Sequence, residues 1–365
     1  MERNGAMVDF HADAATLAGV SPRLEHLAMT NAGWLRAEPH GLHIVPADAW
    51  IDPSRPVARA LVTHGHADHA RGGHGETIAT AATLDIMALR YAASEGTRSV
   101  AYGESLSLPG GVRATFVPAG HVLGSAQILL EHAGERIVVT GDYKRRPDPT
   151  CPPFEPVACD ILITEATFGL PVFRHPPIGQ EIARLLAARE ANPDRAILVG
   201  AYALGKAQRL IAELRLAGHS EPIWLHGAME KMCTLYERHD VSLGPLRPVA
   251  DGPKSAEKAE LAGQIVLCPP SALNDRWSRR LPDPLTAMAS GWMQVRQRAR
   301  QRMVELPLII SDHADWNELT ATIEEVNPAE TWITHGREEA LLRWCQLSQR
   351  RARALALVGY EDEDD

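Results

Sequence analysis

The amino-acid sequence predicts an α/β fold, and two patterns carry this prediction. Between residues 41 and 164, short β-branched or apolar runs are separated by Gly, Pro and Asp, which is typical of strands joined by turns. Beyond residue 178, helical periodicity alternates with short apolar runs, which indicates a mostly parallel sheet covered by helices. The length of 365 residues allows two domains or one large one.

The individual elements follow from these patterns. In the first part of the chain we expect a helix at 80–92, with Thr80 as candidate N-cap, and strands at 42–45, 60–63, 114–117, 126–131, 136–140 and 161–164. In the second part we expect helices at 178–188, 204–216, 228–238, 315–325 and 336–348, and strands at 196–200, 222–226, 264–267, 306–310 and 330–334. Asp315 and Glu318 have the spacing of a capping box. Residues 248–260 read as a surface loop, and residues 1–33 as a loosely attached N-terminal extension.

Composition excludes several classes of protein. With 45% hydrophobic and 23% charged residues, the chain is expected to be a soluble globular protein. It contains no apolar run of the roughly 18 residues that a membrane span needs, and its N-terminal stretch lacks the apolar core of a secretory signal. The five cysteines are scattered and form no C-x-x-C pair, which favours reduced thiols in a cytoplasmic protein.

Charge gives two opposing indications about nucleic acid. The net charge of −9 argues weakly against such a partner, although part of it comes from an acidic tail at 361–365. Seven arginines argue for it locally: Arg276, Arg279, Arg280, Arg296, Arg298, Arg300 and Arg302. They fit either a track for a nucleic acid backbone or a salt-bridged surface. Trp277 and Trp292 in the same stretch fit either base stacking or burial.

Four metal-ligating residues follow the expected strand at 60–63 within six positions: His64, His66, Asp68 and His69. Imidazole and carboxylate groups suit zinc and neighbouring metals. In an extended loop His64 and His66 point the same way and can share one ion, whereas Asp68 and His69 turn toward a second. Three further candidates each close an apolar strand next to a glycine: His121, Asp142 and His335. The sequence therefore predicts a two-metal hydrolase.

Taken together, these residues resemble the metallo-β-lactamase superfamily, and later motifs resemble its β-CASP nuclease group. Residues 164–169 look like that group's acidic motif A, 311–315 like motif B and 334–336 like motif C, while 205–208 look like a helix start in its inserted domain. The residues at 141–146 and 200–206 most resemble the corresponding motifs of bacterial ligase-associated DNA exonucleases. The histidine at motif C also occurs in the RNA-processing branch, so this motif does not assign the substrate.

The resemblance spans residues 34–360 and implies an αββα sandwich carrying an inserted domain. We expect the metallo-β-lactamase domain at 34–175 and 300–360, and the inserted β-CASP α/β domain at 176–299. One divalent ion is expected on His64, His66 and His121, and a second on Asp68, His69 and His335, with Asp142 as the bridge. Zinc is favoured and manganese is permitted. The ions would activate a bridging hydroxide for in-line attack at phosphorus.

The expected catalytic set is Asp68, His313 and Glu165. His313 is the candidate general acid for the leaving sugar oxygen, and Glu165 orients it; the alternatives are a residue preceding the Asp315 cap and a structural hydrogen bond at a sheet edge. Substrate contact is expected from Lys144, Arg145, Arg146 and Lys206. A solvated loop is the alternative for the first three, and a plain helix turn for Lys206.

The resemblance implies a metal-dependent DNA exonuclease in bacterial DNA repair, with DNA as substrate and a functional association with a DNA ligase and a helicase. An RNA-processing exonuclease or endonuclease of the same fold is the alternative. A catalytically silent nucleic-acid-binding subunit is disfavoured because all seven ligand positions are intact. A small-molecule hydrolase is disfavoured by the inserted segment.

Overall fold

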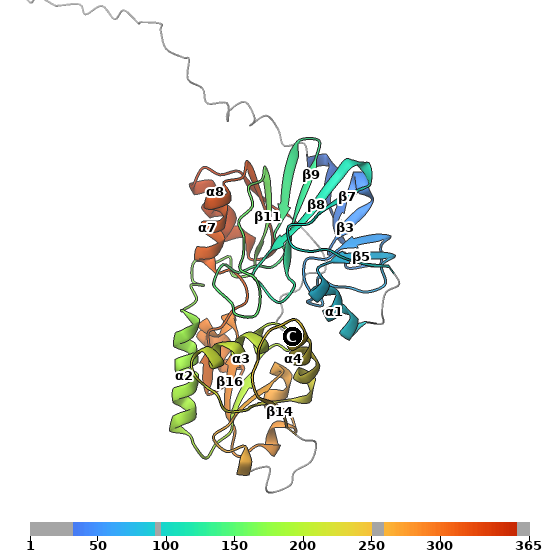
Figure 1. Cartoon of the computed structure of the whole chain (residues 1–365). Helices are drawn as coiled ribbons and strands as arrows, with labels where there is room; N and C mark the ends of the chain where they lie inside the picture. The colour runs from blue at the N-terminus through green and yellow to red at the C-terminus, as the bar shows by residue number, and fades with distance from the viewer. Residues whose placement is uncertain (1–31, 92–95, 250–258, 356–365) are drawn as a thin grey trace, which may run out of the picture.

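The computed structural model describes residues 32–91, 96–249 and 259–355, which form two lobes, one above the other in Figure 1. The predicted acidic tail 361–365, most of the N-terminal extension 1–33 and most of the loop 248–260 lie outside the described residues. Within the described ranges, no helix combines the length and apolarity that crossing a bilayer requires.

The upper lobe contains two mixed sheets packed face to face. The first has the order β1 (Leu35–Glu38), β2 (Gly41–Ile44), β3 (Ala49–Ile51), β4 (Arg59–Leu61), β5 (Glu76–Ala79) and β6 (Thr97–Ser99). The second has the order β19 (Ala352–Ala354), β18 (Glu330–Gly336), β11 (Ile161–Ala166), β10 (Glu135–Val139), β9 (Ala126–His132), β8 (Val112–Pro118) and β7 (Ser105–Leu108).

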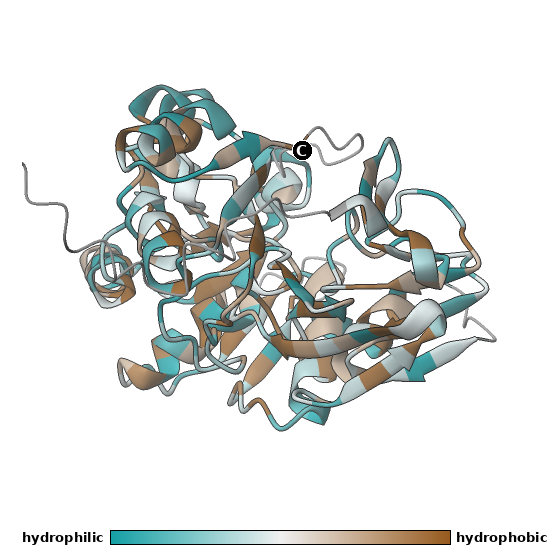
Figure 2. Ribbon diagram, turned by 90° about the horizontal axis from the view of Figure 1, so that it is seen from above, coloured by the Kyte–Doolittle hydropathy of each residue, from teal (hydrophilic) through white to brown (hydrophobic). Residues whose placement is uncertain are grey.

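A continuous apolar core joins the inner faces of these two sheets, with Ile44, Leu61, Ile128 and Ile163 among its buried members. Helices cover the outer faces. Helix α1 (Ala81–Arg90) packs on the first sheet, and α7 (Trp316–Val326) and α8 (Glu338–Leu347) pack on the second. In Figure 2 the hydrophobic residues gather on the interior strands. This is the αββα order that the resemblance implies, so the predicted fold class is confirmed.

The lower lobe is built on a six-stranded sheet in which every pairing is parallel. Its order is β14 (Leu246–Pro248), β13 (Ile223–Leu225), β15 (Ile265–Cys268), β12 (Ile197–Gly200), β16 (Leu285–Ala289) and β17 (Leu306–Leu308). One face packs against α2 (Ile178–Ala191), α3 (Lys206–Leu216) and α4 (Gly227–Arg238). The other packs against short 3-10 turns and α6 (Arg296–Gln301).

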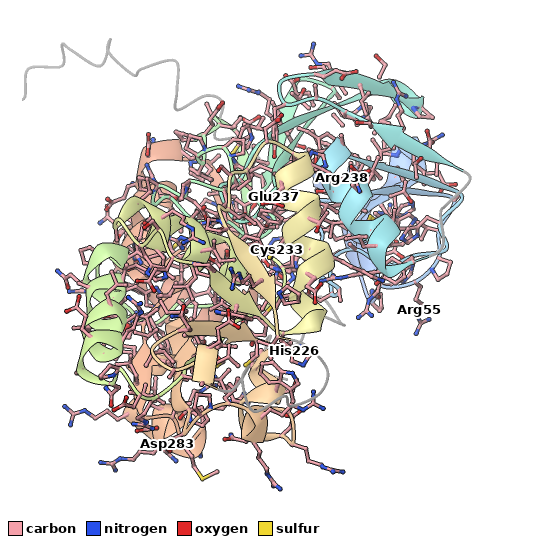
Figure 3. The ribbon with its side chains drawn as sticks, turned by 60° about the horizontal axis from the view of Figure 1, so that its bottom comes forward. Arg55, His226, Cys233, Glu237, Arg238 and Asp283 are labelled. Atoms are coloured by element: carbon pink, nitrogen blue, oxygen red, sulfur yellow. The ribbon has the colours of Figure 1, made fainter. Side chains whose placement is uncertain are left out.

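This third sheet is inserted between β11 and β18, which are parallel neighbours in the second sheet. One predicted boundary is wrong: strand β17 pairs with β16 and so belongs to the inserted sheet, although it follows residue 299. Helix α4 also contacts α1 of the upper lobe. His239 Nε2 lies 2.8 Å from Asp85 Oδ2, and Figure 3 places Glu237 and Arg238 at this end of α4.

The predicted helices are all present, with shifted ends. Thr80 caps α1 by accepting from Thr83 N, and Asp315 and Glu318 form the predicted capping box of α7. Helix α8 begins at Glu338 rather than at 336 because β18 continues through His335 to Gly336. The sequence reading missed β1, β3, β5, β6, β7, β14, β16, β19 and α6. These strands have three to five residues and are held by pairing with neighbours rather than by a strong local pattern.

Candidate metal centre

The predicted ligands come together at the strand ends of the upper lobe that face the inserted domain. His64 and His66 follow β4, His121 follows β8, and Asp142 follows β10. The ligand atoms of these four buried residues all lie within 4.8 Å of one another. The chain therefore gathers at one point residues that are up to 78 positions apart, because successive strands end at the same edge of the sandwich.

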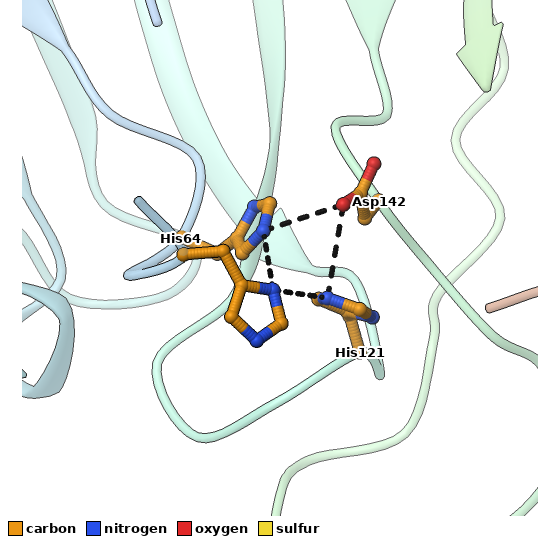
Figure 4. Close-up of side chains that lie close together, drawn as sticks. His64, His121 and Asp142 are labelled. Atoms are coloured by element: carbon orange, nitrogen blue, oxygen red, sulfur yellow. Dashed lines mark hydrogen bonds and ion pairs between the residues drawn. The ribbon is translucent and has the colours of Figure 1, made fainter. Parts of the chain in front are cut away.

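The first ligand group is tightly clustered (Figure 4). The Nδ1 atom of His66 lies 3.1 Å from His64 Nε2 and 3.0 Å from His121 Nε2. The Oδ2 atom of Asp142 lies 3.4 Å from His64 Nε2 and 3.8 Å from His121 Nε2. Two nitrogens bound about 2.05 Å from a tetrahedral zinc ion stand about 3.3 Å apart, so the spacing of this donor set fits such an ion.

The second ligand group shares Asp142 with the first. The Oδ2 atom of Asp142 also lies 3.4 Å from His69 Nε2, which in turn lies 3.5 Å from Asp68 Oδ2. The ring of His335 is 5.1 Å from that of His69. A single carboxylate oxygen thus faces nitrogens of both groups, which is the position that a bridging ligand needs.

The backbone at the last of these ligands adopts an unusual conformation. His335 has φ = 55°, and Gly336 after it has φ = 104°. A Cβ on Gly336 would lie 2.5 Å from the backbone oxygen of Ala166, so only glycine fits there. A non-glycine residue in the left-handed region is held there by its surroundings at some cost in free energy, which is typical of functional sites.

A residue that the sequence reading missed, Asp52, holds the histidines in place. Its Oδ2 lies 2.8 Å from His69 Nδ1 and accepts from Thr63 Oγ1 at 2.6 Å. The Thr63 hydroxyl, which donates to Asp52, lies 3.1 Å from His64 Nδ1 and so accepts from it. Both imidazoles therefore carry their protons on Nδ1 and turn Nε2 toward the cluster. The only sequence signal was an aspartate directly after the apolar run 49–51.

Replacing Asp52 by alanine is expected to weaken metal binding about 10- to 100-fold, since His69 would lose the carboxylate that orients it. Titration of the metal-free chain with zinc against a competing chelator measures this. Asp48→Ala is the matched control, because Asp48 has a similar backbone (φ 44° against 45°) but a side chain that is 83% exposed. Equal zinc affinities for the two variants would contradict the orienting role.

The tautomers and pKa values of the other histidines bear on metal binding as well. His121 Nδ1 lies 2.7 Å from the carbonyl oxygen of Asp312, which can only accept, so Nε2 is left for a metal. Burial lowers the pKa of His64 and His121 well below the usual value and that of His335 to about 3. Neutral imidazole is the form that binds metals. For His69, burial acts to lower the pKa, but the carboxylates of Asp142 and Asp68 outweigh it and raise the pKa.

Glu165 and His313 lie side by side next to this cluster. Glu165 Oε2 is 3.0 Å from His313 Nδ1, and Glu165 Oε1 accepts from Tyr143 N at 2.7 Å. Both side chains are buried, and burial raises the pKa of Glu165, which His313 counteracts. The structure thus brings together the two residues named for proton transfer from positions 148 apart in the sequence.

Three of the predicted substrate contacts are held by protein groups. Lys144 is only 1% exposed; its Nζ donates to the carbonyl oxygens of Gly120 and His121 and pairs with Asp148 at 2.7 Å. Arg145 pairs with Glu325, and Arg146 with Asp315, both on the α7 side. Lys144 therefore supports the loops around the centre from inside, whereas substrate contact by the partly exposed Arg145 and Arg146 stays a prediction.

Lys206 does line the centre, but it also belongs to a buried charge cluster. Its Nζ lies 3.1 Å from Asp312 Oδ2. Arg209, one turn further along α3, donates to Asp312 Oδ1 at 3.2 Å and lies 3.5 Å from Asp148 Oδ2. Because Asp312 also accepts from His121 through its backbone, this cluster ties α3 of the inserted domain to a metal ligand.

Replacing Asp148 by asparagine is expected to lower the free energy of unfolding by about 3 kcal/mol, because it leaves the buried Lys144 and Arg209 without one of their counter-charges. Denaturant unfolding measures this change. Asp283→Asn is the control: its side chain is 84% exposed and its ion pair with Arg195 should contribute under about 1 kcal/mol. A loss for Asp148→Asn as small as that of the control would show that the cluster does not stabilise the fold.

A pocket opens over the second ligand group, and we call it the metal pocket. It is lined by Asp68, His69, Asp142, Thr167, Phe168, Tyr202, Lys206, Ser290, Gly291, Trp292, Ser311, His313, His335 and Gly336. Both lobes contribute residues to it. Both tryptophans of the arginine-rich stretch are buried, Trp277 against His226 and Trp292 in this pocket wall.

Comparison with known proteins agrees with this geometry. Residues 41–200 match the family model of the metallo-beta-lactamase superfamily. A probable DNA ligase of Opitutus terrae is 32% identical over 319 residues, which are 84% of this chain and 30% of that protein. Endoribonuclease YSH1 of Mycosarcoma maydis is 30% identical over 223 residues, 48% of this chain and 25% of that protein. The chain thus spans less than a third of the length of either relative.

A crystal structure of a protein of unknown function from Enterococcus faecalis V583 superimposes with a TM-score of 0.56 at 13% identity, covering 82% of this chain and 79% of that one. This similarity concerns the fold alone. The predicted metallo-β-lactamase domain is confirmed by the match over residues 41–200. The chain carries a metallo-β-lactamase superfamily domain, and nucleases of the β-CASP group are among its relatives.

Proposed function

We propose that this protein is a metal-dependent phosphodiester hydrolase that degrades DNA from an end. The observation that carries the proposal is that two ligand groups, one of His64, His66 and His121 and one of Asp68, His69 and His335, meet at Asp142. The buried pair of Glu165 and His313 lies beside them. Two ions held there would supply a nucleophilic water at neutral pH and stabilise charge at phosphorus. Zinc suits the histidine-rich set, and manganese is also permitted.

The chain's own residues would complete the reaction. His64, His66 and His121 would hold one ion; Asp68, His69 and His335 the other; and Asp142 both. His313 faces the pocket and would give a proton to the leaving sugar oxygen, while Glu165 would keep its imidazole turned toward the pocket. Phe168 and Trp292 in the pocket wall would limit access of bulk water.

DNA is favoured over RNA as substrate because the match to the probable DNA ligase runs over 84% of this chain, against 48% for the endoribonuclease. The same match supports a functional association with a DNA ligase; association with a helicase, a role in DNA repair and a cytoplasmic location remain proposals from the resemblance. An RNA-processing nuclease is the second candidate, favoured by the similarity to the endoribonuclease of Mycosarcoma maydis.

End-labelled single- and double-stranded DNA and RNA of one sequence, given to the zinc- or manganese-loaded chain, test this proposal. We expect DNA to be cut at least about tenfold faster than RNA, with products shortened progressively from one end. Faster cutting of RNA would overturn the DNA assignment, and internal cuts in circular DNA would overturn the exonuclease assignment. If none of the substrates is hydrolysed, the assignment of the protein as a nuclease is overturned.

A further inference from the structure

The chain returns from the inserted domain to the metallo-β-lactamase domain through residues 309–315, between β17 and α7, and we call this stretch the crossing segment. It carries His313, the proposed general acid, and it belongs to neither a helix nor a strand. Its backbone groups therefore lack the regular pairing that would fix them inside such an element. The position of His313 depends on the side chains and loops that hold the crossing segment from outside.

A buried guanidinium of the inserted domain holds the middle of this segment. Arg209 on α3 is only 1% exposed. Its Nη1 atom donates to the backbone oxygen of Ser311 at 2.6 Å and to Asp312 Oδ1 at 3.2 Å. Hydrogen bonds from a charged donor are stronger than those from a neutral one. The crossing segment is therefore anchored to α3 at the two residues directly before His313.

The two anchored residues also support the metal centre. The backbone oxygen of Asp312 lies 2.7 Å from His121 Nδ1 and so fixes the tautomer that leaves Nε2 for a metal. The hydroxyl oxygen of Ser311 accepts from the backbone N–H of His313 at 3.1 Å. A displacement of these two residues would therefore move the acceptor that orients a metal ligand and the backbone that carries the proposed acid. Arg209 is the side chain of α3 that holds both of them.

Charge balance alone does not account for Arg209. Each of the two carboxylates beside it has another cation as partner. Asp148 pairs with Lys144 at 2.7 Å. Asp312 pairs with Lys206 at 3.1 Å. Both buried carboxylates would therefore keep a counter-charge without the guanidinium, which avoids the large cost of an uncompensated buried charge. What the guanidinium adds is its donor to the backbone of the crossing segment.

We propose that Arg209 is a positioning residue of the metal centre, through which the inserted domain sets the positions of His121 and His313. Arg209 does not line the metal pocket, so it acts through the backbone of the crossing segment rather than on substrate. This inference rests on the proposed function for the role of His313. It adds that the inserted domain orients one ligand of the first ion and the general acid together.

The test replaces Arg209 by methionine, which has a similar length and no donor, and by lysine, which keeps the charge and one donor nitrogen. Arg215→Met is the matched control. Arg215 lies near the other end of α3 and donates to the backbone oxygens of Leu243, His219, Glu221 and Pro245. Titration of the metal-free chain with zinc against a chelator measures affinity without turnover. Hydrolysis at saturating zinc is compared for a single-stranded DNA oligonucleotide and for bis(p-nitrophenyl) phosphate, called the small diester below.

We expect Arg209→Met to weaken zinc binding about 10- to 100-fold, as the loss of a group that orients a ligand does. The ratio of kcat on the oligonucleotide to kcat on the small diester should fall at least about tenfold, because only the sugar oxygen needs a proton from His313. Arg209→Lys should recover part of both losses, and Arg215→Met should show neither. Unaltered zinc affinity or an unaltered ratio in Arg209→Met would overturn the positioning role, as would equal losses in Arg215→Met.

Misfolding and failure of the proposed function give different results. Thermal unfolding followed by circular dichroism shows whether Arg209→Met is folded. If it is not, Asp312→Asn decides, because it removes the charge that Arg209 holds and keeps the backbone oxygen that faces His121. Unaltered zinc affinity in Asp312→Asn would then overturn the positioning role. If the unaltered chain hydrolyses neither substrate, the phosphodiesterase assignment fails, while the zinc titrations still decide whether Arg209 positions His121.

Discussion

Replacing Asp142 by alanine is expected to remove nearly all hydrolysis, by about a thousandfold or more in kcat/KM. The Oδ2 atom of Asp142 is within 3.4 Å of both His64 and His69, one from each ligand group, so its loss affects both ions at once. Two ions stabilise a phosphoryl transition state by several kcal/mol, and about 4 kcal/mol corresponds to a thousandfold. Steady-state assays on the small diester, together with metal analysis of the purified variant, measure the effect.

Metal content distinguishes this explanation from misfolding. We expect Asp142→Ala to retain fewer than two ions per chain while its thermal unfolding stays cooperative, because a buried carboxylate among histidines mainly serves the cation. Asp194→Ala, which removes an exposed carboxylate from the inserted domain, is the control and should keep both ions and full activity. Hydrolysis that survives Asp142→Ala with full metal content would refute the two-metal centre.

Replacing His313 by alanine is expected to have the second largest effect, a loss of about 10²- to 10⁴-fold on an oligonucleotide. The leaving sugar oxygen is strongly basic and needs a proton, and His313 is held 3.0 Å from Glu165 at the pocket that opens over the second ligand group. The p-nitrophenolate of the small diester is a weak base that leaves without a proton. The loss on that substrate should therefore be far smaller.

This dependence on the leaving group identifies the role of His313, and the metal content is its control. His313 is not among the seven proposed metal ligands, so His313→Ala should keep two ions per chain. Glu165→Gln should reproduce the same pattern to a lesser degree, since the imidazole would lose its charge partner. An equal loss on both substrates, or a loss of metal, would instead assign His313 to the metal centre itself.

The sequence alone predicted the ligand set and the family. His64, His66, Asp68 and His69 are close in the chain, and their spacing is specific enough to predict metal binding without any fold. The glycine next to each of His121, Asp142 and His335, together with an apolar strand before it, was a local signal as well. Resemblance then related Glu165 and His313 to one another, and the tertiary structure brings them within 3.0 Å.

Only the tertiary structure decided which groups surround those ligands. Asp52 orients His69 across 17 positions, and no local pattern marks a single aspartate for that role. Lys144 follows the bridging Asp142 closely and looked like a rim residue, but the fold turns its ammonium inward to two carbonyls. Likewise, strand β17 belongs to the inserted sheet because it pairs with β16 there. Ligand chemistry is a property of the residues themselves, so the sequence by itself could predict the metal site. Burial and long-range pairing depend on the whole fold, so only the tertiary structure identified the groups that support that site.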